Sequence, residues 1–213
     1  MTRCFIVTGT DTGIGKTVFS SALVGVLNGY YWKPIQSGLD QETDSEVVRR
    51  LSGLANDRIL PEAWRLRTPA SPHLSAAIDR VAIVPAQLRL PDIDQPLVIE
   101  GAGGLLVPLT RKITYIEVFS QWAQPVILCA RTELGTINHT LMSIETLRRR
   151  AIPIAGVAFI GDERADTQEI IGEMTAVPIL GRLPILGELT QESLRNAFEA
   201  HFDLSFLEEW AVA

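Results

Sequence analysis

Cysteine is scarce in this chain of 213 residues, and no apolar run is long enough to cross a membrane. The two cysteines, Cys4 and Cys129, lie inside apolar runs, which is typical of buried thiols in a reducing compartment and excludes a disulfide scaffold. The apolar run at residues 4–7 is too short for the core of a secretion signal. For these reasons we expect a cytoplasmic protein.

Positive charge is also in short supply. The chain has 19 Lys and Arg residues against 25 Asp and Glu residues, and its formal net charge is −6. A surface of this sign repels phosphate backbones and anionic lipids, so we expect no nucleic-acid or membrane partner. Only three of the basic residues are lysines, at Lys16, Lys33 and Lys112. A compact ammonium and a planar guanidinium are not interchangeable where one point charge must reach one oxygen, and two of the three lysines, Lys16 and Lys33, lie in the motifs described below.

Short apolar runs alternate with segments of helical pattern along the chain. The runs lie at residues 4–7, 97–100, 126–130, 154–160 and 179–180, and a further strand is expected at 30–35. They are continuous and rich in β-branched residues, which is typical of strands covered on both faces. Helices are expected at residues 16–27, 44–54, 114–123, 137–150, 166–175 and 191–201. This alternation predicts a doubly wound, mostly parallel α/β sheet in one domain over residues 1–213, with the irregular segment 55–90 crossing over the sheet.

A glycine-rich loop follows the first predicted strand and precedes the first predicted helix. Its sequence, TGTDTGIGKT at residues 8–17, is a variant phosphate-binding loop, because Gly9 lies one residue earlier than the strict pattern requires. In such a loop backbone N–H groups surround phosphates, the lysine reaches the β and γ oxygens, and the following hydroxyl binds Mg²⁺. Lys16 and Thr17 hold these two positions. The sheet is therefore predicted to be of the P-loop NTPase type.

Two carboxylates and a second lysine are candidates for the same site. Glu100 ends the run PLVIE and precedes GAGG, so we expect it at the carboxyl end of a strand, where a second metal ligand would stand. Asp44 begins a predicted helix, where it is either a ligand or an N-cap. Lys33, in WKPIQSG, is expected at the same rim as the glycine loop, with Ser37 four residues later. Lys33 is either functional or a surface residue, and the scarcity of lysine favours function.

Five motifs occur in an order and at spacings similar to those of one enzyme family. They are TGTDTGIGKT at residues 8–17, WKPIQSG at 32–38, ASPH at 70–73, EGAGG at 100–104 and GTINH at 135–139. With these motifs the chain resembles the dethiobiotin synthetases over almost its whole length. The resemblance implies an ATP- and Mg²⁺-dependent homodimeric ligase that forms carbon–nitrogen bonds. Its substrates would be 7,8-diaminononanoate and CO₂, and its product would be dethiobiotin, in biotin biosynthesis.

The resemblance also implies roles for individual residues. The expected catalytic residues are Lys33, Lys16 and Thr12. The residues expected to bind the substrate are Ser37, Ser71, Pro72 and His73, together with Gly135, Thr136, Ile137 and Asn138. The last four would form a helix start across the dimer interface, where free amides suit the substrate carboxylate. The residues expected to bind ATP are Gly13, Ile14, Gly15, Lys16, Thr17, Val18, Asp44, Glu100, Gly101, Ala102, Gly103, Pro184, Ile185 and Leu186. The expected Mg²⁺ ligands are Thr17, Asp44 and Glu100, which makes Asp44 a ligand rather than a cap.

Two positions differ from related patterns. Where some relatives have an Asn that contacts adenine, this chain has Ile160. Base contacts are therefore expected from backbone groups, with ATP as the default and another nucleoside triphosphate as the alternative. Partition and targeting ATPases, the alternative functional class, often have an extra lysine in the glycine loop, where this chain has Asp11. Asp11 is expected either to contact the substrate or to order the loop.

Overall fold

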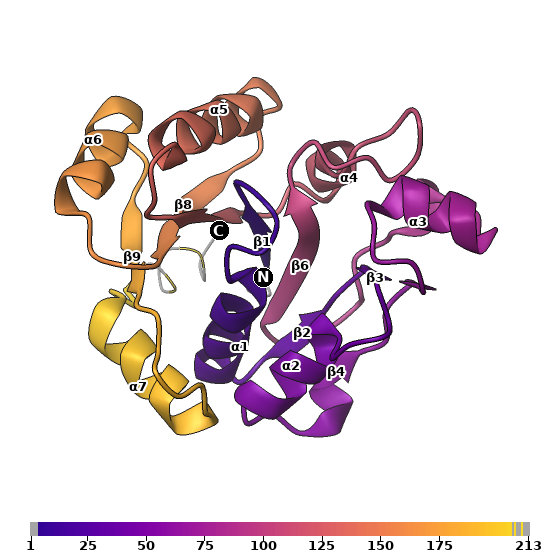
Figure 1. Ribbon diagram of the computed structural model, residues 1–213, viewed down its shortest axis with the longest axis horizontal. Helices are drawn as coiled ribbons and strands as arrows, with labels where there is room; N and C mark the ends of the chain where they lie inside the picture. The colour runs from indigo at the N-terminus through magenta and orange to yellow at the C-terminus, as the bar shows by residue number, and fades with distance from the viewer. Residues whose placement is uncertain (1–3, 206, 208–209, 211–213) are drawn as a thin grey trace.

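A parallel β-sheet with helices on both faces forms the centre of the fold (Figure 1). The computed structural model describes residues 4–205, 207 and 210. The strands of the main sheet are β1 (Cys4–Gly9), β2 (Tyr30–Trp32), β4 (Ile59–Leu60), β6 (Leu97–Gly104), β7 (Val126–Arg131), β8 (Ile154–Ile160) and β9 (Ile179–Leu183). Their order is β4-β2-β6-β1-β7-β8-β9, and every adjacent pair is parallel. The predicted doubly wound, mostly parallel sheet is confirmed.

The longer helices lie in two groups, one on each side of the sheet. α1 (Lys16–Leu27), α2 (Asp44–Leu51) and α7 (Gln191–His201) contact one another along one side (Figure 1). α3 (Pro72–Asp79), α4 (Tyr115–Trp122), α5 (Thr136–Arg149) and α6 (Ala165–Thr175) lie along the other side. α1 and α7 begin and end at the predicted residues. α2 ends earlier than predicted, and Gly53 soon after it has a φ of 74°, which cannot continue a helix.

Successive residues of the central strand β1 are buried on opposite faces of the sheet. Phe5 and Val7 lie in the apolar cluster that includes Phe19 of α1 and Phe198 of α7, whereas Ile6 lies in a second cluster. Side chains alternate along a strand, so a strand covered on both faces needs a continuous apolar run. This requirement explains the run CFIV. A single domain over residues 1–213 stays a prediction.

The segment predicted as one strand at residues 30–35 forms two short strands in different sheets. β2 ends at Trp32, and β3 (Ile35–Ser37) pairs in parallel with β5 (Trp64–Leu66) in a two-stranded sheet. The prediction was wrong because Pro34 lacks the N–H group that a continuous ladder needs. In Figure 1, β3 lies between β2 and α3. Lys33 therefore stands at the break, at the carboxyl end of β2.

The irregular segment 55–90 is partly sheet and partly excursion. It contains the 3₁₀ turns Asn56–Arg58 and Pro85–Gln87 together with β4, β5 and α3. β4 pairs with β2 at the edge of the main sheet. This part of the segment extends the sheet, whereas the prediction had the whole segment crossing over it.

Both cysteines are free thiols. Cys129 is fully buried, and Cys4 is partly buried. Burial raises the pKa of Cys4 to about 12. The prediction of thiols rather than a disulfide is confirmed.

Within the described part of the chain, no helix is long and apolar enough to span a membrane, and the cytoplasmic location stays a prediction.

Candidate active site

Left-handed glycines shape the loop between β1 and α1. Gly13 has a φ of 70°, and Gly15, the residue before α1, has a φ of 91°. A Cβ atom on Gly15 would lie 2.9 Å from Cγ2 of Ile160, so this position accepts only glycine. The loop leads directly into the positive end of α1. This arrangement is suited to binding phosphate.

Lys16, the first residue of α1, folds back over the loop. Its side chain is almost buried, and its Nζ atom donates a hydrogen bond of 3.0 Å to the carbonyl oxygen of Asp11. Burial lowers the pKa of Lys16, although the Glu100 carboxylate opposes this shift. The ammonium of Lys16 is thus held against the glycine loop.

Asp11 orders the glycine loop. Its Oδ1 atom accepts a hydrogen bond of 2.7 Å from the backbone N–H of Thr12. Its Oδ2 atom pairs with Arg131 at 3.6 Å, and the same guanidinium donates a hydrogen bond of 3.3 Å to the carbonyl oxygen of Thr12. Of the two roles left open for Asp11, the structure favours loop ordering. Arg131, at the end of β7, was missed from the sequence because only the fold brings it to the loop.

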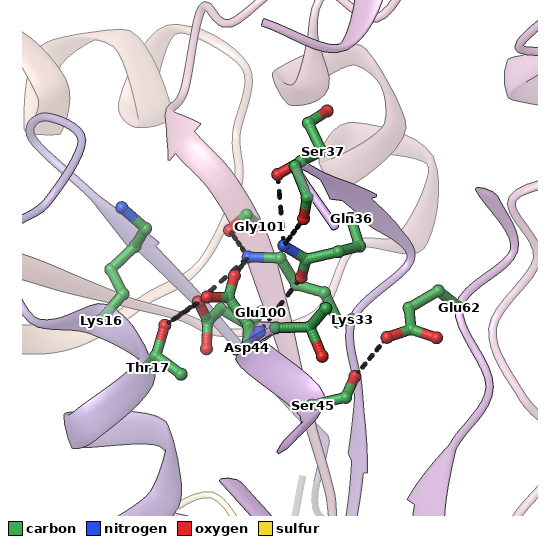
Figure 2. A network of polar contacts seen from close by, with 12 residues as sticks. Lys16, Thr17, Lys33, Gln36, Ser37, Asp44, Ser45, Glu62, Glu100 and Gly101 are labelled. Atoms are coloured by element: carbon green, nitrogen blue, oxygen red, sulfur yellow. Dashed lines mark hydrogen bonds and ion pairs between the residues drawn. The ribbon is translucent and has the colours of Figure 1, made fainter. Parts of the chain in front are cut away.

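Three oxygen-bearing side chains from separate elements meet beside the loop (Figure 2). The Oγ1 atom of Thr17 on α1 lies 3.1 Å from Oδ1 of Asp44 on α2 and 2.9 Å from Oε1 of Glu100 on β6. Glu100 is almost fully buried. These are the three side chains that the sequence predicts as metal ligands, and the structure brings them together.

Asp44 is not the N-cap of its helix. Thr43 is the N-cap, and its side chain forms a capping box with Glu46. The Asp44 carboxylate is therefore free to face the site. Burial raises the pKa of Asp44, but Lys33 and the Thr17 hydroxyl lower this pKa by more than burial raises it, so the net shift is downward. Asp44 is held as the carboxylate that a cation requires.

The ammonium of Lys33 lies between the two carboxylates (Figure 2). It forms an ion pair with Asp44 Oδ2 and donates hydrogen bonds of 3.0 Å to Glu100 Oε1 and 3.0 Å to the carbonyl oxygen of Gly101. Burial alone would lower the pKa of Lys33, but the Glu100 and Asp44 carboxylates raise it above its ordinary value. Lys33 is a buried, charged member of the site. The surface interpretation of Lys33 is wrong.

Two supporting side chains were missed from the sequence. Tyr31 is fully buried and donates a hydrogen bond of 3.0 Å to Glu100 Oε2. It lies two residues before Lys33, so strand alternation gives a weak signal that both face one side. The Oε1 atom of Gln36 accepts a hydrogen bond of 3.2 Å from the backbone N–H of Asp44, and its Nε2 atom donates to the carbonyl oxygen of Ser37. No local pattern marks Gln36, because its partners come from the fold.

One cavity of about 800 Å³ connects the glycine loop with Lys33. The predicted residues that line it are Thr12, Gly13, Ile14, Gly15, Lys16, Thr17, Val18, Lys33, Ser37, Asp44, Ser71, Pro72, Glu100, Ala102 and Gly103. The Ser37 hydroxyl oxygen is buried and lacks a hydrogen-bond partner in the described part of the chain. His73 does not line the cavity, and its Nδ1 atom lies 3.0 Å from Ser71 Oγ. The structure thus assembles most of the predicted site in one place.

A second cavity of about 580 Å³ lies on the other side of the glycine loop. The predicted residues that line it are Gly13, Ile14, Gly135, Thr136, Ile137 and Ile185, and Ile160 also lines it. Within one chain the start of α5 is therefore not brought into the cavity that holds Lys33. Asn138, Pro184 and Leu186 line neither cavity, and Leu186 packs against the apolar core.

The sequence is similar to a set of enzymes over nearly its full length. A family model for an AAA domain matches residues 3–193. The ATP-dependent dethiobiotin synthetase BioD of Brucella anthropi is 63% identical over 96% of this chain and 97% of that protein. The enzyme of the same name from Rhodopseudomonas palustris strain BisB5 is 63% identical over 99% of this chain and 100% of that protein. The enzyme of the same name from Agrobacterium fabrum is 60% identical over 98% of this chain and 99% of that protein.

Solved structures that resemble the chain are nucleotide-binding proteins of the same sheet type. A putative plasmid partition protein of Borrelia burgdorferi bound to AMPPNP has a TM-score of 0.55 at 12% identity, over 99% of this chain and 96% of that chain. The septum site-determining protein MinD of Pyrococcus horikoshii, complexed with Mg-ADP, has a TM-score of 0.52 at 17% identity, over 92% and 86%. At such identities the likeness shows the fold alone, and it confirms the P-loop NTPase type. The identities of 60–63% to full-length relatives show more, and the chain belongs to the ATP-dependent dethiobiotin synthetase family.

Proposed function

We propose that this chain is a ligase that uses ATP to carboxylate 7,8-diaminononanoate with CO₂ and to close the ring, giving dethiobiotin, ADP and phosphate. One observation carries the proposal: a single cavity of about 800 Å³ holds Lys33 beside both the glycine loop and the carboxylates of Asp44 and Glu100. Such a cavity accommodates a triphosphate next to a second substrate. The names of the family relatives give ATP and the product, dethiobiotin, and the resemblance of the motifs implies the diamine as the second substrate.

ATP would bind with its phosphates in the glycine loop, against the backbone N–H groups between Gly13 and Val18. Its base would enter the cavity of about 580 Å³ that Ile160 and Ile185 line. Ile160 is apolar and faces Gly15, so it offers the base no hydrogen bond. Base contacts would come from backbone groups of the segment with Pro184, Ile185 and Leu186. ATP is thus the default nucleotide, and another nucleoside triphosphate is the alternative.

The oxygens of Thr17, Asp44 and Glu100 fit Mg²⁺. This ion prefers hard oxygen ligands and binds to proteins through one or two carboxylates together with substrate phosphates. No group of three His, Cys, Asp or Glu side chains suited to a metal occurs among the described residues. The proposed set is two carboxylates and a hydroxyl, to which phosphate oxygens of the nucleotide would add further ligands. When bound, Mg²⁺ supplies positive charge to the phosphoryl group that is transferred.

The diamine would occupy the end of the cavity near Ser37. The buried hydroxyl of Ser37 has no partner among the described side chains and backbone groups, as expected of a group reserved for a ligand. Ser71 and Pro72 at the start of α3 line the same end, and Thr12 lies on the glycine-loop side. His73 would act through Ser71.

The reaction has three bond-forming steps. An amine takes up CO₂ as a carbamate, and a carbamate oxygen attacks the γ-phosphorus as ADP leaves. The second amine then attacks the carbamate carbon, and phosphate leaves as the ring closes. None of the three steps needs a covalent bond to the protein, so the side chains act by orientation and by charge. Lys16 and Lys33 neutralise negative charge on the phosphoryl and carbamate oxygens.

A second copy of the chain is part of the proposal. Leu134, just before α5, is fully exposed, and the exposed side chains of Leu106 and Met142 line one groove beside α5. Exposed apolar side chains in one region are typical of an interface. The Thr136 N–H donates a hydrogen bond of 3.1 Å to the carbonyl oxygen of Glu133. In a homodimer the positive end of α5, from Gly135 to Asn138, would bind the substrate carboxylate in the other copy's cavity through its remaining N–H groups.

Phosphate release from ATP and Mg²⁺, with and without 7,8-diaminononanoate plus bicarbonate, tests this function. Labelled carbon is followed into acid-stable product at the same time. We expect release to require both additions, with carbon fixed in step. Lys112→Met, at an exposed lysine, is the control for Lys33→Met, which should lose turnover. Steady hydrolysis that ignores the diamine would contradict the proposal and favour a partition-type switch ATPase.

A further inference from the structure

All the N–H donors of the Lys33 ammonium are already engaged. An ammonium has three donors and no acceptor. Lys33 uses them for the ion pair with Asp44, for Glu100 Oε1 at 3.0 Å and for the carbonyl oxygen of Gly101 at 3.0 Å. Its side chain is 4% exposed. In this arrangement Lys33 has no donor left for an oxygen of ATP or of a carbamate.

The carboxylates that hold Lys33 are the same two that are proposed for Mg²⁺. Glu100 Oε1 contacts both Lys33 Nζ, at 3.0 Å, and Thr17 Oγ1, at 2.9 Å. Mg²⁺ binds its ligand oxygens at about 2.0–2.1 Å, so an ion on this oxygen would lie next to the ammonium and repel it. The ammonium and the divalent cation therefore compete for one position.

We propose that Lys33 is the resident cation of this site in the nucleotide-free protein, and that the incoming metal–nucleotide complex displaces it. The inference rests on the proposed Mg²⁺ site. A buried carboxylate, Glu100, beside a partly buried one, Asp44, is unfavourable without a cation, and Lys33 supplies the charge until the metal arrives. Displacement frees its three donors, and its flexible stem lets the ammonium turn into the cavity toward the reacting oxygens. Lys33 would thus reach them only when the metal is bound.

The second carboxylate oxygen of Glu100 has a separate support. Tyr31 donates to Oε2, whereas Lys33 and Thr17 contact Oε1. The carboxylate therefore keeps one fixed donor while the cation on its other oxygen changes. This division lets ammonium and metal exchange without rebuilding the site.

The side-chain ammonium signals of ¹⁵N-lysine-labelled protein test the exchange on the unaltered chain. Only three lysines are present, so the Lys33→Met and Lys112→Met variants assign the signals. We expect the Lys33 signal to persist in nucleotide-free protein and to stay in place with a non-hydrolysable ATP analogue and EDTA. Mg²⁺ added to that sample should shift or broaden the signal. A change caused by the analogue alone, or an unchanged signal with Mg²⁺ bound, would overturn the proposal.

Calorimetric titration of Mg²⁺ into the same samples separates the proposed metal site from the proposed exchange of Lys33 for the metal. If Mg²⁺ does not bind with the analogue, the proposed metal site is wrong and the exchange proposal falls with it. If Mg²⁺ binds but the Lys33 signal is unchanged, only the exchange is wrong. The function itself is judged separately, by fixation of labelled carbon.

Mn²⁺ binding without nucleotide, followed by the electron paramagnetic resonance signal of free Mn²⁺, gives an independent readout. We expect Lys33→Met to bind Mn²⁺ at least about tenfold more tightly than the unaltered chain, because the competing cation is gone. Lys112→Met should bind as the unaltered chain does. Equal affinities in Lys33→Met and the unaltered chain would overturn the proposal.

Discussion

Removal of the Tyr31 hydroxyl measures how far the buried Glu100 carboxylate depends on its donors. Tyr31 is 0% exposed, and its hydroxyl donates a hydrogen bond of 3.0 Å to Glu100 Oε2. Tyr31→Phe keeps the ring and removes this donor. A hydrogen bond to a charged group contributes about 1.5–3 kcal/mol, so we expect the free energy of unfolding to fall by about 2 kcal/mol. With a urea slope of about 2 kcal/mol per M, the unfolding midpoint should fall by about 1 M.

Tyr115→Phe is the matched control. Tyr115 is also 0% exposed, but its hydroxyl has no hydrogen-bond partner in the part of the chain that the structure describes. Removing a buried hydroxyl without a partner also removes its desolvation cost, so the midpoint should stay the same or rise. Equal losses in the two variants would refute the reasoning, because the loss would then come from removing any buried hydroxyl and not from the hydrogen bond to Glu100.

Three further predictions concern the site and the thiols. Lys33→Ala should still bind a fluorescent ATP analogue but lose turnover by about a hundredfold or more, whereas Lys16→Ala should weaken both ATP binding and turnover. Near-normal turnover in Lys33→Ala would remove its catalytic role. Gly15→Ala should weaken ATP binding by about tenfold in calorimetric titration, because Gly15 has a φ of 91° and an added Cβ would clash with Ile160. Gly187→Ala is the control: its Cβ would meet open space, so this variant should bind ATP normally. Because burial raises the pKa of Cys4 to about 12 from 9.0, its stabilising contribution is fully present below pH 9.0 and is lost as the pH rises toward 12. Urea unfolding between pH 8 and pH 10.5 should show this loss in the unaltered chain and less of it in Cys4→Ala.

The parts of the site that the sequence predicted well are those that depend on neighbours along the chain. Gly15, Lys16 and Thr17 follow a strand and open a helix, and their roles depend on that local order. Continuous apolar runs such as CFIV predicted a sheet covered on both faces, because burial of alternating side chains on both faces leaves no room for polar residues. The single strand expected at residues 30–35 was wrong, because Pro34 outweighs the apolar pattern around it.

By itself the sequence determined most of the alternating strands and helices, the glycine-rich loop and the family, and it predicted which lysines and carboxylates meet beside that loop. Only the tertiary structure decided that Thr43 caps α2 and leaves Asp44 to the site, that Tyr31 supports Glu100, and that Lys33 occupies the place proposed for a metal. The physical reason is distance along the chain. The hydrogen bond between Thr17 and Glu100 joins residues 83 positions apart, and the contact between Lys33 and Glu100 spans 67. Contacts of this kind arise from strand order and packing, which no local pattern records.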